Sequence, residues 1–254
     1  MFVIQYWPDG APPPDIRDRQ NGWRAAFGAR HILFDADHAR HFLTRHFGAD
    51  TAALFDDCAV PAMASDFFRY HAVAVLGGLY VDSELMLGDV ARLRRVLDVT
   101  GPLTAAVPAV DQTPDIATAR QHLGRVLLNN VLFAPADAPY VQTLAALVRE
   151  LVRLRADTQI PYVTGIGVLS ALDYAIRQPD DPIPTLRAAL PRDKARFLNI
   201  LTRFITDHDL RALTPAVAVD FRDLAGVIDR PAHDDARLTD PAHWSNHRGS
   251  IFTT

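Results

Sequence analysis

The sequence predicts an α/β fold in which helices flank a mixed central sheet. Two short apolar segments, residues 2–7 and 31–34, have the composition of buried strands. They alternate with stretches whose apolar residues recur at helical spacing, and a third helix and strand follow between residues 62 and 85. This alternation is typical of a nucleotide-binding core. Ligands of such folds bind at the carboxyl ends of the strands, so polar residues there are the first candidates for a site.

Local residues set the boundaries of the early elements. A Pro-Asp-Gly turn and three consecutive prolines end the first strand. The next helix is predicted at residues 15–27, where Ile16, Trp23 and Phe27 lie at helical spacing. After the second strand, we expect Asp37 to cap a further helix.

The second half of the chain has a looser pattern. Strands are predicted at residues 103–110 and 126–133. An amphipathic helix follows at residues 140–156, and its interleaved arginines are expected to form a solvated face. Residues 180–213 are expected to be helical, as an insertion or a small lid.

No internal repeat or low-complexity linker divides the chain, so residues 1–254 are expected to form one domain. The tail, residues 229–254, is polar and interrupted by prolines, yet it contains Trp244, Ile251 and Phe252. A disordered tail rarely holds such large apolar residues. We therefore expect the tail to fold back on the core.

The most informative stretch joins the third helix to the third strand. Asp66 and Arg69 are three residues apart, so they share one face of the helix. A Gly-Gly pair follows, and then Tyr80, Asp82 and Glu84 alternate along a strand predicted to reach Leu85, so all three point to one side. Two neighbouring carboxylates suit a hard divalent cation that keeps waters and binds phosphate oxygens. The stretch therefore predicts a site for a polar, phosphate-bearing ligand.

The same residues resemble a sugar-transferase signature. The resemblance is to Asp-x-Asp glycosyltransferases, and the two groups named next carry Ser-Asp-x-x-Arg, about seven residues, and then Gly-Gly-x-Tyr-x-Asp-x-Asp. More narrowly, the resemblance is to glycosyltransferase family 32 (α-1,6-mannosyltransferase and capsular polysaccharide type) and to the sugar-transferase domain of clostridial glucosylating toxins. The chain matches from Ser65 to Asp82 and has Glu84 in place of the last Asp. Glu keeps the carboxylate but adds a methylene, so Glu84 would contact a metal either directly or through water.

The resemblance implies a GT-A-like fold and a metal-assisted transfer. Asp66 and Arg69 would contact the donor sugar, and Asp82 and Glu84 would hold Mn²⁺ or Mg²⁺ on the diphosphate. In the toxins a tryptophan at the end of the first strand stacks on the nucleotide base, and Trp7 matches it. Aromatic stacking on a flat base is physically reasonable.

Three further segments resemble the family more loosely. The segment after Thr164 is similar to a Thr-Gly-Pro-x-x-Leu element with Pro missing, and Gly165 would let the backbone approach the ligand there. A helix N-terminus also favours an anion. The tail is similar to a closing His-x-x-x-Gly-Ser-Trp segment, in which His247 would reach the metal and Ser250 the phosphates. Ser65 would contact the edge of the base.

Several of these residues also have ordinary structural explanations. Asp66 and Arg69 would form a simple ion pair on any helix. Trp7 and Tyr80 would pack in the core, and Ser65 would cap the helix. The histidine pair His38 and His41, and the pair His243 and His247, lack a metalloprotease pattern, and most such pairs are solvated.

The composition argues against other classes of protein. The formal net charge is −4, so no basic footprint for nucleic acid is present. Cys58 is the single cysteine, which excludes an intramolecular disulfide and a cysteine zinc site and favours a buried, unreactive thiol. The N-terminus lacks a signal-peptide pattern, and no apolar run reaches the ~20 residues that span a bilayer. We expect a cytoplasmic protein without an integral membrane segment, able to work at the inner face of a membrane.

The motif and the resemblance together predict a metal-dependent hexosyltransferase, and the resemblance implies a reaction that retains anomeric configuration. The donor would be a nucleotide diphosphate sugar, UDP- or GDP-linked, and the acceptor a hydroxyl of a glycan, a lipid-linked glycan or a protein, as in polysaccharide or glycoconjugate synthesis. Two other functions stay open: a nucleotide-sugar phosphohydrolase and a non-catalytic nucleotide-sugar-binding protein. Donor hydrolysis that no acceptor affects would favour the phosphohydrolase. Donor binding without turnover would favour the binding protein.

Overall fold

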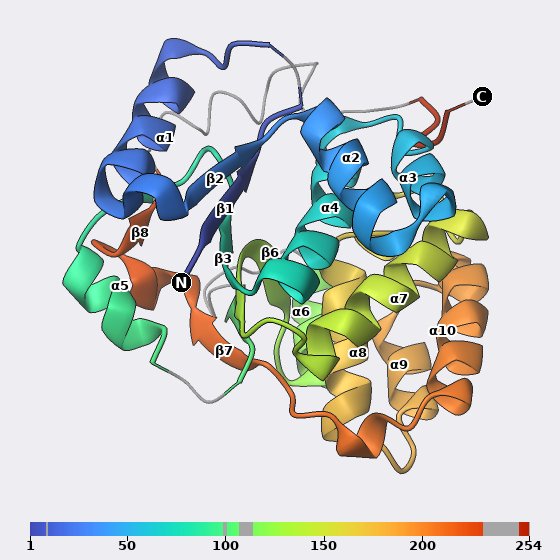
Figure 1. Cartoon of the computed structure of the whole chain (residues 1–254). Helices are drawn as coiled ribbons and strands as arrows, with labels where there is room; N and C mark the ends of the chain where they lie inside the picture. Colours follow the sequence, from blue (N-terminus) through green and yellow to red (C-terminus); the bar gives the residue numbers. More distant parts are fainter. Residues whose placement is uncertain (9, 99–100, 107–113, 231–248, 254) are drawn as a thin grey trace.

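The computed structural model of the chain describes residues 1–8, 10–98, 101–106, 114–230 and 249–253. A six-stranded sheet lies between two layers of helices (Figure 1). Its strands follow the order β2 (His31–Phe34), β1 (Val3–Tyr6), β3 (Gly78–Val81), β6 (Leu127–Ala134), β5 (Leu103–Ala106) and β7 (Val217–Asp220). A second, two-stranded sheet pairs β4 (Met86–Leu87) with β8 (Ile228–Asp229).

The central sheet is mixed. Strand β1 runs parallel to β2 and β3, β6 runs antiparallel to β3 and β5, and β5 runs parallel to β7. Ile4 pairs with Tyr80, so β1 and β3 end at the same edge of the sheet, and Trp7 and Asp82 follow there. The mixed sheet between helices confirms the predicted fold class.

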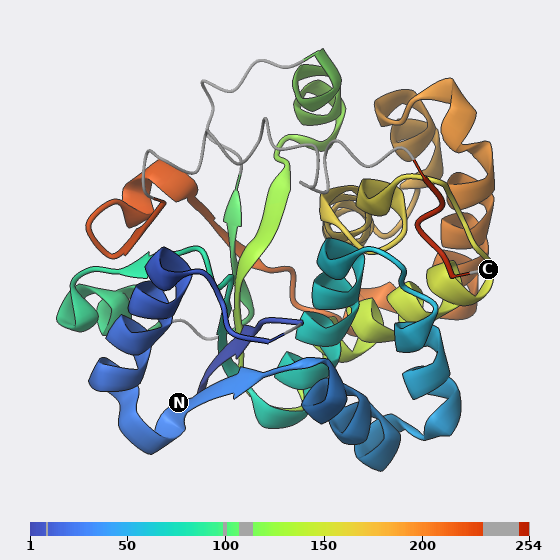
Figure 2. The same cartoon turned by 90° about the horizontal axis from the view of Figure 1, so that it is seen from above.

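Helices cover both faces of the sheet (Figure 2). On one face, side chains of β1, β3, β5 and β6 pack against α1 (Pro14–Phe27) and α5 (Val90–Val96). The larger core lies on the other face and joins the sheet to α2 (Ala36–Phe47), α3 (Ala49–Asp56), α4 (Pro61–Leu76), α6 (Pro114–Leu123), α7 (Pro139–Arg153), α8 (Ile166–Arg177), α9 (Ile183–Ala189) and α10 (Ala195–Asp207). Five short 3₁₀ turns complete the described chain: Gly28–Arg30, Ile160–Tyr162, Arg192–Lys194, Leu210–Ala212 and Phe221–Leu224.

Most predicted elements form within a few residues of their expected bounds. Two boundaries differ. The cap of α2 is Asp35, whose carboxylate accepts the His38 backbone N–H at 2.8 Å, and not Asp37. Strand β3 ends at Val81 rather than at Leu85, because the chain turns after Asp82. Helix α3 was not predicted, and of the strand expected at residues 103–110 only the first four residues lie in the described part.

The segment expected as an insertion or lid is helical, as predicted. Buried Leu186 of α9 and Phe197 of α10 belong to the same core as the sheet residue Ile4. The division of the chain into domains stays a prediction.

The end of the tail folds back on the core, as expected. Ile251 and Phe252 are buried, the Ala59 N–H donates to the Ile251 carbonyl at 3.0 Å, and Phe252 forms a β-bridge with Cys58. Trp244 and His243 lie outside the described residues. Cys58 is itself buried, which confirms the packing role expected for it.

No helix in the described part of the chain is long and apolar enough to cross a membrane.

Candidate functional site

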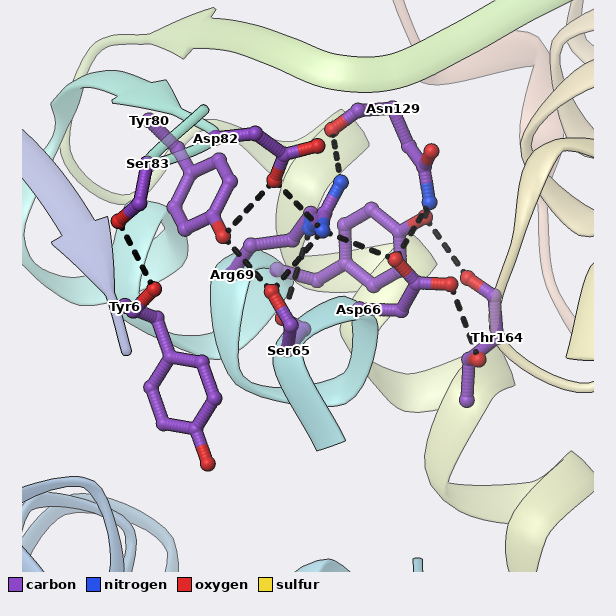
Figure 3. A network of polar contacts seen from close by, with 10 residues as sticks. Tyr6, Ser65, Asp66, Arg69, Tyr80, Asp82, Ser83, Asn129 and Thr164 are labelled. Carbon is purple, nitrogen blue, oxygen red and sulfur yellow. Dashed lines mark hydrogen bonds and ion pairs between the residues drawn. The ribbon is translucent and has the colours of Figure 1, made fainter. Parts of the chain in front are cut away.

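A network of buried polar side chains lies at the carboxyl ends of β1 and β3 (Figure 3). Its centre is Arg69 of α4. One guanidinium nitrogen, Nη2, lies 3.0 Å from Asp66 Oδ1 and 2.9 Å from Asp82 Oδ1. The side chain of Arg69 is 4% exposed and that of Asp66 is 9% exposed, whereas that of Asp82 is 24% exposed. Asp82 is therefore the carboxylate that faces solvent.

Two neighbouring segments hold Asp66 in place. Its Oδ1 accepts a hydrogen bond from the Asn129 amide of β6 at 2.8 Å, and its Oδ2 accepts one from the Thr164 hydroxyl at 3.2 Å. Tyr70 links the same two segments, because its hydroxyl donates to the Thr164 carbonyl at 2.8 Å and accepts from the Asn129 amide at 3.2 Å. Sequence analysis missed Asn129 and Thr164 as site residues, because they meet Asp66 only through tertiary contacts. It also missed Tyr70, although Tyr70 lies four residues after Asp66 on α4.

An irregularity in the β5–β6 pairing accompanies the placement of Asn129. The register shifts after Thr104, whose hydroxyl donates to the carbonyls of Leu128 and Val131. Such irregularities bend a strand and redirect its side chains, and they are frequent beside active sites. Here the Asn129 carbonyl accepts from Arg69, while the neighbouring Asn130 carbonyl accepts the Asp82 N–H at 3.0 Å. The irregular stretch of β6 thus contacts both Arg69 and Asp82.

The charges within the network do not balance. Burial raises the pKa of Asp66 to about 7, even though Arg69 lowers it, and the charge of Asp82 raises it further. Burial also raises the pKa of Asp82, against the opposing effects of Arg69, Tyr80 and Arg230. Burial disfavours the Arg69 charge, but the carboxylates outweigh that effect, so its pKa is raised. Two buried carboxylates share one guanidinium, and a proton or a bound cation would offset the surplus negative charge.

This surplus gives a testable pH dependence for the ligand-free protein. The folded-state pKa of Asp66, about 7, lies above the ordinary aspartate value of 3.8, so this group stabilises the fold most below pH 4. That contribution is lost as the pH rises through 7. Asp66→Asn removes the titration, so we expect the stability of the variant relative to the parent to rise between pH 4 and 8 by roughly 2 kcal/mol or more. Urea unfolding at several pH values measures this, and parallel curves for the two proteins would contradict it.

The turn after Asp82 is held by helix α1. The Trp23 indole donates to the Leu85 carbonyl at 2.9 Å, and Arg19 Nη1 donates to the Glu84 carbonyl at 2.7 Å. The Gln20 amide donates to the Ser83 hydroxyl at 3.1 Å, and that hydroxyl donates to the Tyr6 carbonyl of β1 at 3.0 Å. The turn carrying Glu84 is therefore fixed to both α1 and β1.

This turn corrects the prediction that Tyr80, Asp82 and Glu84 alternate along one strand. Tyr80 lies in β3, Asp82 follows it, and Ser83 and Glu84 form the turn. Tyr80 and Asp82 do meet, because the Tyr80 hydroxyl donates to Asp82 Oδ1 at 3.1 Å. The position of Glu84 is set by the turn and not by strand periodicity.

Ser65 is not the helix cap that its position in the sequence suggested. It lies inside α4, which begins at Pro61, so it caps nothing. Its hydroxyl lies 2.8 Å from the Tyr80 hydroxyl and accepts from Arg69 Nη2 at 3.0 Å. The Arg69 guanidinium lies over the Tyr80 ring, 4.6 Å from its centroid. Ser65 and the fully buried Tyr80 therefore orient Arg69 from one side.

Trp7 and Gly165 border the network. Trp7 is half-buried directly after β1, where its backbone N–H donates to the Phe34 backbone carbonyl at 2.9 Å. Gly165 caps α8, and a Cβ there would lie 3.4 Å from Asp66 Oδ2 and 3.0 Å from the Cα of Pro161. Glycine thus permits close packing beside Asp66. The Gly165 N–H already donates to the Ile160 carbonyl at 3.0 Å.

The closing residues expected in the tail are only partly described. His247 lies outside the described residues. Ser250 is exposed, and its hydroxyl donates to the Phe252 carbonyl at 2.8 Å. Its role toward phosphates stays a prediction. His38 and His41 are exposed on α2, as expected for solvated side chains.

The donor set at the edge of the sheet fits a metal shared with a diphosphate. Asp82 Oδ1 is used by Arg69 and Tyr80, whereas Oδ2 receives no hydrogen bond from the residues that the structure describes. Within that part of the chain no three His, Cys, Asp or Glu side chains gather as a complete metal cage. Mg²⁺ typically takes one or two carboxylates and completes its shell with water and phosphate oxygens. The Asp82 carboxylate suits that pattern, and Glu84 follows two residues later in the turn.

The similarity of the chain to known proteins is limited. No family model matches the chain. A segment of 95 residues is 29% identical to an uncharacterized glycosyltransferase of Acanthamoeba polyphaga mimivirus, and this match spans 35% of the chain and 38% of the viral protein. Among solved structures, the PaToxG glycosyltransferase aligns with 81% of the chain and 86% of its own length, at a TM-score of 0.43 and 11% identity. The chain is thus similar to a glycosyltransferase over about a third of its length.

Proposed function

We propose that this protein is a metal-dependent glycosyltransferase that transfers a sugar from a nucleotide diphosphate sugar to a hydroxyl acceptor. The observation that carries the proposal is the shared contact of Arg69 with Asp66 and Asp82 at the carboxyl edge of β3. The sequence similarity to the viral glycosyltransferase supports the same reaction class. The family that the motif resembles suggests retention of anomeric configuration.

Each part of the network has a role in this proposal. Asp82 and, on the neighbouring turn, Glu84 would hold Mn²⁺ or Mg²⁺, which supplies Lewis-acid stabilisation of the departing diphosphate. Arg69 and Asp66 would orient the sugar by charged hydrogen bonds, which are stronger than neutral ones. Trp7, at the end of the neighbouring strand, would stack on the base. The Arg230 guanidinium, close enough to lower the pKa of Asp82, would add positive charge near the phosphates.

Donor binding is the direct test of the reaction class. A thermal-shift screen of UDP- and GDP-sugars, with and without Mn²⁺, should identify a donor that raises the melting temperature only when metal is present, because a ligand that binds the native state alone stabilises it. Transfer is then assayed with hydroxyl acceptors. Donor hydrolysis unaffected by every acceptor would favour a phosphohydrolase, and binding without any turnover would favour a non-catalytic binding protein.

A second experiment separates sugar contacts from nucleotide contacts. Asp66→Asn should weaken binding of the whole nucleotide sugar by roughly tenfold or more, because a buried charged hydrogen bond to the sugar is lost. Binding of the bare nucleoside diphosphate should change little. Calorimetric titration of both ligands measures the difference, with Asp18→Asn, an exposed carboxylate on α1, as the matched control. Equal weakening of both ligands would contradict the sugar contact.

A further inference from the structure

A concave surface lies at the end of β1 and β3 that is opposite to the end where Asp82 lies. It is a hollow of about 610 Å³, which we call the basic hollow, formed by Phe27, Arg30, Arg94, Arg95, Leu97 and Phe133, with Met1 at its margin. Met1 precedes β1, whereas Asp82 follows β3, which is parallel to β1. The basic hollow and the candidate active site therefore lie at opposite ends of these strands. Figure 1 shows the N-terminus close to α5 at this end.

The charge of the basic hollow is unusual for this chain. The protein carries 30 acidic and 26 basic residues, yet three arginines and a single carboxylate, Asp98, line the hollow. None of Arg30, Arg94 and Arg95 has a carboxylate within ion-pair distance in the described residues, although other exposed arginines, such as Arg153, are paired. Three guanidiniums from two different elements thus line one hollow that contains a single carboxylate, Asp98.

One exposed apolar side chain, Met1, lines the hollow beside these arginines, and Phe2 follows it in the chain. Met1 is 40% exposed and Phe2 is 38% exposed, and both rank among the few large apolar residues that reach solvent in the described structure. The half-buried Phe27 and Phe133 extend this apolar character into the hollow. Exposed apolar residues beside an excess of basic ones are typical of surfaces that meet a membrane interface.

We propose that the basic hollow binds the headgroups of an anionic phospholipid surface. The planar guanidinium groups of Arg30, Arg94 and Arg95 match phosphate oxygens in paired hydrogen bonds. Met1 enters the interfacial layer beside them. In this orientation Asp82 lies on the side away from the lipid, where a water-soluble ligand reaches it freely. The proposal concerns the docking of the protein and does not depend on the reaction catalysed at Asp82.

Vesicle co-sedimentation with the full chain tests the docking. The protein should bind vesicles that contain phosphatidylglycerol, bind weakly to pure phosphatidylcholine, and lose binding as ionic strength rises. The triple variant R30Q/R94Q/R95Q should bind the anionic vesicles at least about tenfold more weakly, because each arginine near such a surface contributes roughly fivefold.

A matched variant controls for net charge. Arg45, Arg187 and Arg192 are exposed, have no ion pair in the described structure, and lie on α2, α9 and a 3₁₀ turn. R45Q/R187Q/R192Q should keep parental binding, and the thermal unfolding of both triple variants shows whether they fold. Equal loss in both triple variants, or no binding of the parent to anionic vesicles, would overturn the proposal. If the protein does not bind vesicles but binds phosphate or pyrophosphate through these three arginines, the proposal is overturned in favour of a small-anion site.

Discussion

Asp82→Asn is expected to abolish metal-dependent donor binding and to lower transfer by at least two orders of magnitude, while the fold survives. The loss follows because Asp82 Oδ2 is the carboxylate oxygen of the network that the described residues leave available for a ligand. Removing one preorganised group that stabilises transition-state charge typically costs about 10²–10³ in turnover. Steady-state assays at several Mn²⁺ concentrations measure the effect.

The Asp82→Asn variant should still fold, because the same network keeps its hydrogen bonds. Asn at position 82 keeps an oxygen that accepts from Tyr80 and Arg69, and its N–H still donates to the Asn130 carbonyl. The substitution also leaves one carboxylate, Asp66, opposite one guanidinium, which balances the buried charge. Asp18→Asn on the exposed face of α1 is the control. Unchanged turnover in Asp82→Asn would remove the metal site from the proposed function.

Glu84→Gln tests the other carboxylate of the resembling motif. Its turn is held through the backbone carbonyl by Arg19, so the substitution should leave the turn in place. We expect a smaller loss of turnover than in Asp82→Asn if water mediates the contact of Glu84 with the metal. A loss as large as that of Asp82→Asn would indicate direct ligation.

Arg69→Met should give the largest loss of stability in this region, about 3–5 kcal/mol. Arg69 is 4% exposed on its side chain, and its removal leaves the buried Asp66 without its ion-pair partner and removes the same contact from Asp82. The bonds to the Asn129 carbonyl and the Ser65 hydroxyl are lost as well. Chemical denaturation measures the change, and Arg153→Met, which removes an exposed ion pair with Glu150, should cost less than about 1 kcal/mol.

The pH dependence of the stability loss in Arg69→Met shows whether charge or packing causes it. Burial already raises the pKa of both carboxyls, and without Arg69 both pKa values rise further. Groups whose folded-state pKa is raised stabilise the fold below their unfolded pKa and lose that contribution as the pH rises. The destabilisation of Arg69→Met should therefore be smallest near pH 4 and largest near pH 8. A loss independent of pH would mean that packing, and not charge, holds Arg69 in place.

Much of the site could be predicted from local sequence. The separation of Asp66 and Arg69 by three residues places both on one helical face, and they do form an ion pair. The apolar periodicities located α1, β2 and α4 to within about a residue, because each of these elements has clear breakers at its ends. Strand periodicity was less reliable at Asp82, where the chain turns because Trp23 and Gln20 of α1 bind the turn from outside.

Other features required the tertiary structure. Asn129 and Thr164 are far from Asp66 in sequence and no spacing rule links them to it, whereas Tyr70 lies four residues after Asp66 on the same helix. Likewise, the basic hollow gathers Arg30 and Arg94 from separate elements. Sequence by itself determined which side chains each helix and strand presents, since that depends on backbone periodicity. Only the tertiary structure decided the charge balance around Arg69, because the free energy of a buried charge depends on every group within a few ångströms, whichever part of the chain supplies it.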